Sequence, residues 1–391
     1  MDPGGGGAGT STANLPVDML ANIHGRLSLL DRLAFAAAFR SSRGLFRPEA
    51  PCLVVPGDTP ETVTVFSISG RRAISVRAPE PTLLGHIVLG SSPSRGWLVT
   101  ADDRARLRLV NPVTGERRAL PAITTIPCVN ATTSGDKSCL IINQKWFFRG
   151  PPLRSYGFVT MNPDTLRRCL YRKVVLSDSG DVAMLVTGPA YGAVAFATAG
   201  GESWRLAPLH DSVEPVASPE ADAWRLVPSP DGVEDAVHHE GRFYSITYSG
   251  KLEVWWQQDA DAVFASTVVE LVLPLTLANV DYRKYLMSTP GRRLMIVLKK
   301  TMGSKTPPSI KVQVRSPGAE EWKETDDIGD AALFVGAKGS LCLSTREHPE
   351  LRAGCVYYAA YGRVMVLSLK GGMMEEFDGR GTEWFTPCIP R

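Results

Sequence analysis

The hydrophobic pattern of this 391-residue chain changes once, close to residue 50. Before that point, apolar residues recur every three to four positions, as they do on one face of a helix. This stripe consists of Met19, Leu20, Ile23 and Leu27. Ser28 and Asp31 have the spacing of an acidic capping box, which predicts the start of a second helix. We therefore predict a small three-helix module at residues 14–48.

From Cys52 onward the period falls to two, and short apolar runs alternate with turns rich in Gly, Asp and Pro. Residues 241–255 are a clear example, since they read as a hairpin with Ser249 and Gly250 at its turn. Many short strands at regular spacing are typical of a sandwich, a barrel or a propeller.

An internal repeat favours the propeller. Five residues recur at identical offsets: Val194, Phe196, Gly200, Glu202 and Trp204 correspond to Val312, Val314, Gly318, Glu320 and Trp322. Similarity at fixed offsets in separate parts of a chain is typical of repeated blades. We expect the two tryptophans to be buried between neighbouring blades.

The patterns together predict a mainly β protein whose residues 50–391 form an antiparallel β-propeller. We expect about six blades, with seven also possible, and an irregular insertion at about 122–171. The last strand is expected to pair with the first blade, because closing the ring removes exposed strand edges. Residues 1–13 are mostly Gly, Ser, Thr and Ala, so we expect a disordered head.

Charge and cysteine usage narrow the possible partners and compartments. The net charge is +3, and basic residues occur as isolated pairs, which argues against a nucleic-acid partner. No apolar stretch reaches about 18 residues, so we expect no membrane partner. The sequence has seven cysteines, which is an odd number, and it contains no Cys-x-x-Cys motif. Free thiols and the lack of a leader segment favour the cytoplasm, the nucleus or both.

The sequence contains no motif that predicts catalytic, cofactor-binding or metal-binding residues. His238 and His239 are adjacent, and adjacent residues of a strand point to opposite faces. The glycines at 4–9 lack the Lys-Ser/Thr ending of a phosphate loop. We therefore expect a protein that is not an enzyme and needs no cofactor. An enzyme or small-ligand binder that uses the propeller channel remains an alternative, which convergent carboxylates in that channel would support.

Two consecutive tryptophans provide the best candidates for a target-binding anchor. Trp255 and Trp256 lie in one predicted strand, so their rings must face opposite sides. One of them should lie at the surface or at a blade edge, where an aromatic ring can anchor a partner.

Several segments resemble a known family. The pairing of Gly96-Trp97-Leu98-Val99 with the Asn-Pro-x-Thr-Gly-Glu motif at 111–116 is similar to the first blades of a plant β-propeller domain. That domain is called the KIB type, or domain of unknown function 295. Further similar segments follow in the family's order at 173–177, 241–244, 329–336, 355–358 and 384–387. The chain resembles plant F-box proteins that carry this propeller.

The resemblance implies a function in ubiquitin ligation. Residues 14–48 resemble an F-box, and the positions that match its adaptor-binding surface are Leu15, Pro16, Met19, Leu20, Ile23, Leu27 and Leu33. The family usually has a Trp where this chain has Ser42, which would remove an aromatic anchor.

The implied protein is the substrate-recognition subunit of a Skp–cullin–F-box E3 ubiquitin ligase. Its partners would be a Skp-type adaptor, a cullin held through that adaptor, and a target protein held by the propeller. The alternative is a stand-alone protein-binding propeller with a degenerate F-box that does not engage the ligase.

Overall fold

The computed structural model describes most of the chain. The described residues are 15–77, 83–92, 95–126, 128–134, 137–143, 158–188, 192–207, 232–257, 264–271, 282–300, 309–315, 321–336, 338–360, 362–379, 381 and 383–388. The predicted head at 1–13 lies outside them.

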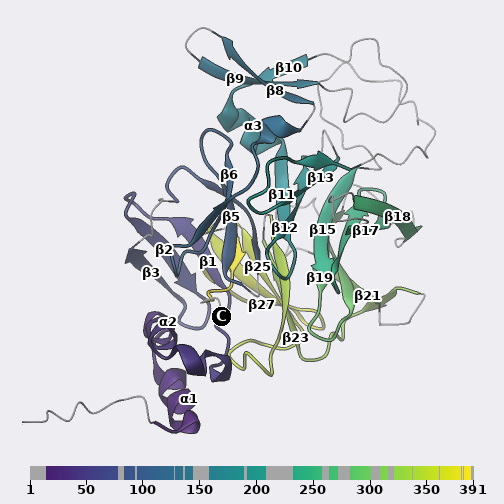
Figure 1. Ribbon diagram of the computed structural model, residues 1–391. Coiled ribbons are helices and arrows are strands. Elements are labelled where there is room, and N and C mark those ends of the chain that lie inside the picture. Colours follow the sequence, from purple (N-terminus) through teal and green to yellow (C-terminus); the bar gives the residue numbers. More distant parts are fainter. Residues whose placement is uncertain are drawn as a thin grey trace, which may run out of the picture.

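The N-terminal module contains helices α1 (Val17–Arg26) and α2 (Leu29–Ala38) and the 3₁₀ helix η2 (Arg40–Leu45). Ser28 caps α2 as predicted, since its Oγ accepts a hydrogen bond of 3.4 Å from the N–H of Asp31. Inside the module, the buried ring of His24 stacks on Phe46 with 4.5 Å between the ring centres. The module therefore has a small core of its own beside the propeller (Figure 1).

Six sheets of four or five strands form the blades of the propeller. Blade 1 holds β1 (Cys52–Pro56), β2 (Thr62–Ser67), β3 (Arg72–Arg77) and the C-terminal β28 (Trp384–Phe385), and blade 2 holds β4 (Ile87–Ser92), β5 (Trp97–Ala101), β6 (Leu107–Val110) and β7 (Arg117–Ala119). Blade 3 holds β11 (Tyr171–Leu176), β12 (Val182–Thr187), β13 (Val194–Thr198) and β14 (Arg205–Leu206), and blade 4 holds β15 (Val233–His239), β16 (Arg242–Thr247), β17 (Lys251–Gln257) and β18 (Phe264–Leu271). Blade 5 holds β19 (Tyr282–Ser288), β20 (Leu294–Lys300), β21 (Ile310–Arg315) and β22 (Lys323–Thr325), and blade 6 holds β23 (Ala331–Val335), β24 (Ser340–Ser344), β25 (Cys355–Ala360), β26 (Arg363–Ser368) and β27 (Gly372–Asp378).

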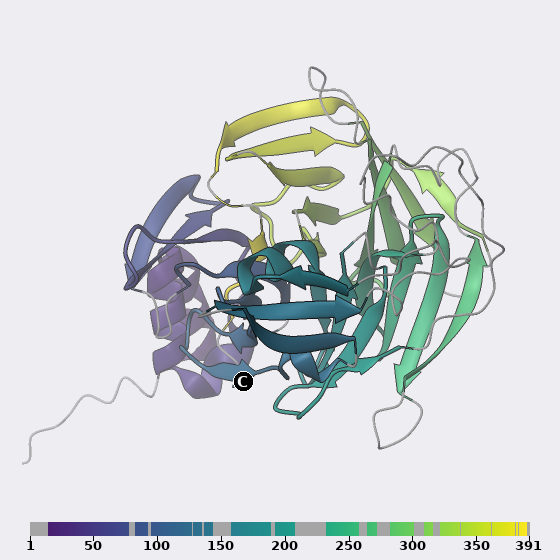
Figure 2. The ribbon, with the colours of Figure 1, turned by 90° about the horizontal axis from the view of Figure 1, so that it is seen from above.

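The blades form a closed ring (Figure 2). β28 pairs with β1, with Phe385 opposite Cys52 and Trp384 opposite Leu53, so the C-terminus completes blade 1. Each pair of neighbouring blades encloses an apolar cluster, including the pair formed by blades 6 and 1. The predicted propeller fold and its closing strand are confirmed.

Blade 6 departs from the predicted antiparallel arrangement. Its strand order is β24-β23-β25-β26-β27, and β23 and β25 run parallel. The cause is the β23–β24 hairpin, which doubles back on the inner side of the blade. Two reversals of direction return the chain alongside β23, so β25 must run the same way as β23.

The part of the chain that connects blade 2 to blade 3 forms a separate three-stranded sheet of β8 (Val129–Ser134), β9 (Lys137–Asn143) and β10 (Phe158–Met161). The 3₁₀ helix η3 (Ile123–Thr125) precedes it and α3 (Pro163–Cys169) follows it. This stretch is more regular than the sequence predicted. α3 is anchored through buried Leu166 and through Arg167, whose guanidinium donates to Ala101 O over 3.1 Å. The sheet and α3 lie on the face of the propeller opposite α1 and α2 (Figure 1).

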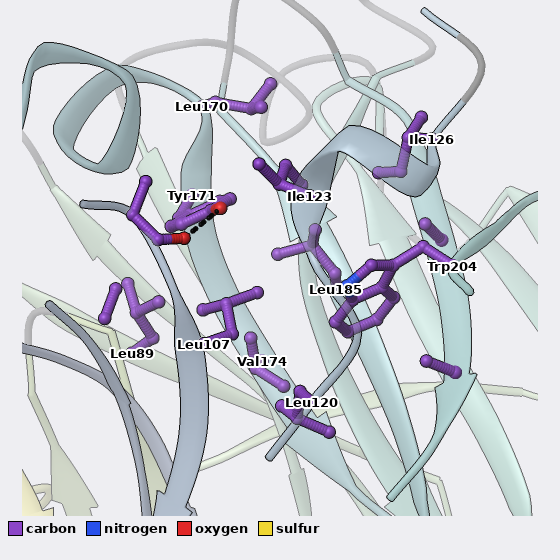
Figure 3. Packing of buried hydrophobic residues seen from close by; sticks show 14 of the residues in the cluster. Leu89, Leu107, Leu120, Ile123, Ile126, Leu170, Tyr171, Val174, Leu185 and Trp204 are labelled. Carbon is purple, nitrogen blue, oxygen red and sulfur yellow. Dashed lines mark hydrogen bonds between the residues drawn. The ribbon is translucent and has the colours of Figure 1, made fainter. Parts of the chain in front are cut away.

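The internal repeat corresponds to equivalent blade positions. In blade 3, Phe196 pairs with Arg205, and in blade 5, Val314 pairs with Lys323, with the same spacing in sequence. Trp204 is buried between blades 2 and 3, where its Nε1–H donates to Pro121 O over 2.8 Å (Figure 3). Trp322 packs in the same way between blades 4 and 5 but is only half-buried. Gly318 and Glu320 lie outside the described residues.

Candidate functional site

Exposed apolar side chains gather on the helical module. The structure describes ten large apolar residues that are exposed, and six of them lie within residues 15–45: Leu15, Val17, Met19, Ile23, Leu30 and Leu45. Met19 and Ile23 lie one turn apart on α1, with 49% and 36% of their surface exposed. Exposed apolar residues that are concentrated in one part of a folded protein commonly mark an interaction site. We call these six residues the apolar face.

The seven predicted adaptor-binding residues divide into two groups. Leu15, Pro16, Met19 and Ile23 are exposed, and Leu27 is half-buried. The expectation that Leu20 shares this exposed surface is wrong, whereas Leu33 is half-buried, as Leu27 is. Leu20 is only 5% exposed, and Leu33 packs against the apolar cluster between blades 1 and 2. Both stabilise the fold, because the module has to pack against itself and against the propeller.

The module is fixed to the propeller by apolar and ionic contacts. Leu29 belongs to the cluster that also contains Phe385 and Val54. Two guanidinium nitrogens of Arg32 donate to the buried carboxylate of Glu49, with the shorter distance 2.6 Å. Burial raises the pKa of Glu49, and Arg32 opposes that shift. These contacts hold the apolar face in a set orientation relative to blade 1.

Ser42, where the resembling family has Trp, is half-buried in η2. Its backbone N–H donates to Phe39 O over 3.1 Å. The small side chain leaves the module without an aromatic ring at this position.

Charged residues gather at the centre of the propeller, where β11, β15 and β19 are the innermost strands of blades 3 to 5. Each of these strands carries two charged residues at its second and third positions: Arg172 and Lys173, Glu234 and Asp235, and Arg283 and Lys284. Lys338 and Glu383 precede the inner strands β24 and β28. We call these eight residues the charged end of the channel. It lies on the side of α3, since α3 leads directly into β11 (Figure 1).

Buried ion pairs at the charged end join consecutive blades. Lys173 Nζ lies 2.7 Å from Asp235 Oδ1, and Lys284 Nζ lies 2.9 Å from Glu234 Oε2. The second oxygen of Asp235 accepts a 2.8 Å hydrogen bond from the N–H of Leu286. Blades 3, 4 and 5 are therefore connected through the side chains of β15.

Our sequence analysis missed this charged cluster, although a signal was present. The tripeptide Tyr-Arg-Lys opens both β11 and β19, at 171–173 and 282–284, and Val-Glu-Asp opens β15 at 233–235. Charged pairs at the same position in three otherwise apolar strands indicate a shared polar environment. Their complementary signs could have predicted the pairing between neighbouring inner strands.

Lys338 and Glu383 complete the charged end. The N–H of Lys338 donates to Glu383 Oε2 over 3.1 Å, and its ammonium donates to Tyr171 O, also over 3.1 Å. Burial lowers the pKa of Lys338 to about 8; Glu383 opposes this shift, and Arg172 and Arg283 add to it. Burial raises the pKa of Glu383 to about 8. Both groups are therefore partly neutral near physiological pH.

A cavity of about 360 Å³ lies in the channel next to the charged end, and Lys173 is among the residues that line it. Its hydroxyl groups come from four blades: they belong to Ser91, Ser92, Ser177, Ser288, Thr289 and Ser340. His238 lines it and lies 3.1 Å from Asp178, whereas the neighbouring His239 contacts Ser288 through Nδ1 at 2.7 Å. The described residues contain no group of three His, Cys, Asp or Glu side chains that could hold a metal ion.

The two tryptophans of β17 face opposite sides of the strand. Trp255 is buried, donates from Nε1 to Ser245 Oγ over 2.8 Å and belongs to the cluster between blades 3 and 4. It is therefore a core residue and not a binding anchor. Trp256 is half-buried, so part of its ring is exposed.

Two further observations concern the chain as a whole. The seven cysteines are free thiols, and four of them are buried. None of the helices within the described ranges is long and apolar enough to span a membrane.

Comparison with a known protein family supports the architecture. Residues 65–380 match the family described as KIB1-4 beta-propeller. The β-propeller domain of Cps50 (Swd1) from Myceliophteria thermophila shares 8% identity and a TM-score of 0.34, over 85% of this chain and 97% of that one. BamB from Moraxella catarrhalis shares 12% identity and a TM-score of 0.31, over 86% and 92%. Similarities this low carry no functional information. No curated protein matches the chain significantly.

Proposed function

The chain belongs to the KIB1-4 β-propeller family, and we propose that it is the substrate-recognition subunit of a Skp–cullin–F-box ubiquitin ligase. In this proposal the helical module binds the Skp-type adaptor, and the propeller binds a target protein. The chain needs no catalytic group for this role, because other subunits perform the ubiquitin transfer. Its free thiols fit a reducing compartment, the cytoplasm or the nucleus.

The observation that carries the proposal is the apolar face of the module. Six large apolar side chains remain exposed within 31 residues, whereas the rest of the described chain exposes only Leu84, Phe158, Met373 and Met374. Isolated exposed apolar residues are ordinary, but a concentration in one small module is characteristic of a docking surface. Its helices also carry the residues that resemble an F-box.

An adaptor-capture experiment tests the proposal. Ile23→Asp and Met19→Asp each place a carboxylate on the apolar face, where adaptor binding would bury it without a partner. We expect at least a tenfold loss of affinity for the Skp-type adaptor in a calorimetric titration, because burying an unpaired charge is costly. Both side chains are exposed in the free protein, so folding should be unaffected.

Met373→Asp is the matched control. Met373 is 47% exposed, close to the 49% of Met19, but it lies on the outermost strand of blade 6. This variant should bind the adaptor as the wild type does. Equal adaptor affinity for all three variants, or no binding by the wild type, would contradict the ligase proposal. The chain would then be better described as a stand-alone binding propeller.

A further inference from the structure

The cavity in the channel has the size of a small-molecule site. Its volume of about 360 Å³ lies near the lower end of the roughly 300–1,000 Å³ that such sites usually have. It opens to solvent beside the turns that follow β11 and β19, since these turns contribute Asp178 and Pro290, which line the cavity and are exposed. A molecule in solution can therefore reach it.

The edges of the inner strands give the cavity polar backbone groups. Residues of β11, β15 and β24 line it, and each of these strands is the end strand of its sheet, paired on one side only. An edge strand keeps N–H and C=O groups along its free side that the sheet does not use. Because the free side of an innermost strand faces the channel, uncharged donors and acceptors alternate along the cavity wall.

The hydroxyl groups add both kinds of hydrogen-bonding partner. Ser91 and Ser340 donate their protons to backbone carbonyl oxygens of neighbouring blades, over 2.8 Å and 3.3 Å. A hydroxyl oxygen has two lone pairs, so each of these serines can still accept a hydrogen bond from a ligand. Thr289 Oγ1 accepts from the N–H of Arg293 over 3.0 Å, and its own O–H can donate to a ligand. The cavity therefore suits groups that both donate and accept.

The ionic side chains that line the cavity already have partners. Lys173 Nζ lies 2.7 Å from Asp235 Oδ1 and donates to Ala236 O over 2.8 Å. His238 Nδ1 lies 3.1 Å from Asp178 Oδ1, and the Asp178 side chain is 77% exposed and therefore hydrated. Among the lining residues that the structure describes, no charge is left without a partner or water. A charged ligand would lose its hydration without finding an unpaired opposite charge, which favours a neutral ligand.

We propose that this cavity binds a free, small, neutral molecule with several hydroxyl groups, such as a monosaccharide or a sugar alcohol. Each hydroxyl of such a molecule both donates and accepts, as the cavity wall does. Its C–H faces would lie against the apolar side chains of Val175, Val237 and Leu341, which line the same cavity. The site is separate from the apolar face, so the proposal does not depend on the ligase function.

Saturation-transfer difference NMR on the full chain tests the inference. The probes are glucose, galactose, mannose, xylose and sorbitol, and we expect at least one of them to saturate the protein below about 10 mM. Ser91→Ala and Ser340→Ala should each weaken its binding by about three- to tenfold, as expected for the loss of one uncharged hydrogen bond. Ser368→Ala is the matched control. Ser368 is also half-buried and accepts a 3.2 Å hydrogen bond from the N–H of Gly371, but it lies on β26 outside the cavity.

A second measurement uses the wild type, so it does not depend on how the variants fold. The NMR signals of the His238 ring should shift when the bound probe is added, whereas those of His24 in the helical module should not. No saturation by any probe, or an unchanged His238 signal, overturns the proposal. Unchanged affinity in both alanine variants overturns it as well. Tighter binding of glucose 6-phosphate or maltotriose than of every neutral probe would assign the cavity to an anion or to the end of a glycan, and it would also contradict the proposal.

Discussion

Trp204 and Trp322 occupy equivalent positions in blades 3 and 5 but differ in burial. Trp204 is 2% exposed and donates a hydrogen bond to Pro121, whereas Trp322 is half-buried. Trp204→Ala should lower the free energy of unfolding by roughly 3–5 kcal/mol, because it leaves a large cavity between two blades. Trp322→Ala should lower it by only about 1–2 kcal/mol, since less apolar area is lost. Urea denaturation measures both values, and equal losses would contradict this reading of the two sites.

Single residues also mark the limit of what a hydrophobic pattern predicts. The spacing of Met19, Leu20, Ile23 and Leu27 identified the apolar side of the first helix. It could not tell which of these residues pack inside the protein and which face a partner, because both environments select the same side chains. Trp255 is a similar case, since alternation predicted opposite faces for Trp255 and Trp256 but not which face is buried.

Between elements, the inner strands are joined by buried ion pairs. Lys284 is fully buried beside Glu234, whose pKa burial raises and Lys284 lowers. Lys284→Met should therefore cost up to about 3–5 kcal/mol of unfolding free energy, because it leaves the buried carboxylate of Glu234 with only the more distant Arg172, at 3.8 Å, as a cationic neighbour. The double variant Glu234→Gln/Lys284→Met should lose less than Lys284→Met alone. Denaturation midpoints of the two variants decide this, and an equal or larger loss in the double variant would refute it.

The matched control for this pair lies in the same blade. Lys311 pairs with Glu324 at 2.9 Å but is 35% exposed, so solvent screens the interaction. Lys311→Met should change the unfolding free energy by only about 0–1 kcal/mol.

A helix or strand could be predicted where the residues that determine it lie close together in the sequence. Most blade strands could be predicted, because period-two alternation and Gly or Pro turns act over a few residues. The parallel pairing of β23 with β25 could not, since it depends on where the β23–β24 hairpin lies relative to the channel. The sheet of β8 to β10 was also missed, because Thr132, Thr133 and Ser134 give its first strand little hydrophobic contrast.

In the whole molecule, the charged end of the channel and the apolar face lie on opposite sides of the propeller. The charged end lies where the inner strands begin, on the side of α3, and the apolar face lies on α1 and its neighbours at the other side (Figure 1). A subunit that must hold an adaptor and a target at the same time requires surfaces that do not overlap. The ring provides this separation because its inner strands all run from one face to the other.

Closure of the ring should control the stability of both surfaces. β28 contributes Trp384 and Phe385, which are 1% and 2% exposed and belong to two different clusters. Phe385 shares its cluster with Leu29 of the helical module. Deleting residues 384–391 should therefore cost at least about 5 kcal/mol, since each buried aromatic contributes several kcal/mol and β1 becomes an open edge.

That loss is comparable to the whole stability of a typical domain, roughly 5–15 kcal/mol. The truncated chain should melt at a much lower temperature or aggregate in differential scanning calorimetry, and it should also lose adaptor capture because Leu29 loses its support. A chain shortened only by residues 389–391 should behave as the wild type does. A full truncation that melts normally would mean that the ring is held by the other contacts between blades alone. The C-terminal strand would then contribute little to the propeller, contrary to its pairing with β1 and the burial of its two aromatic rings.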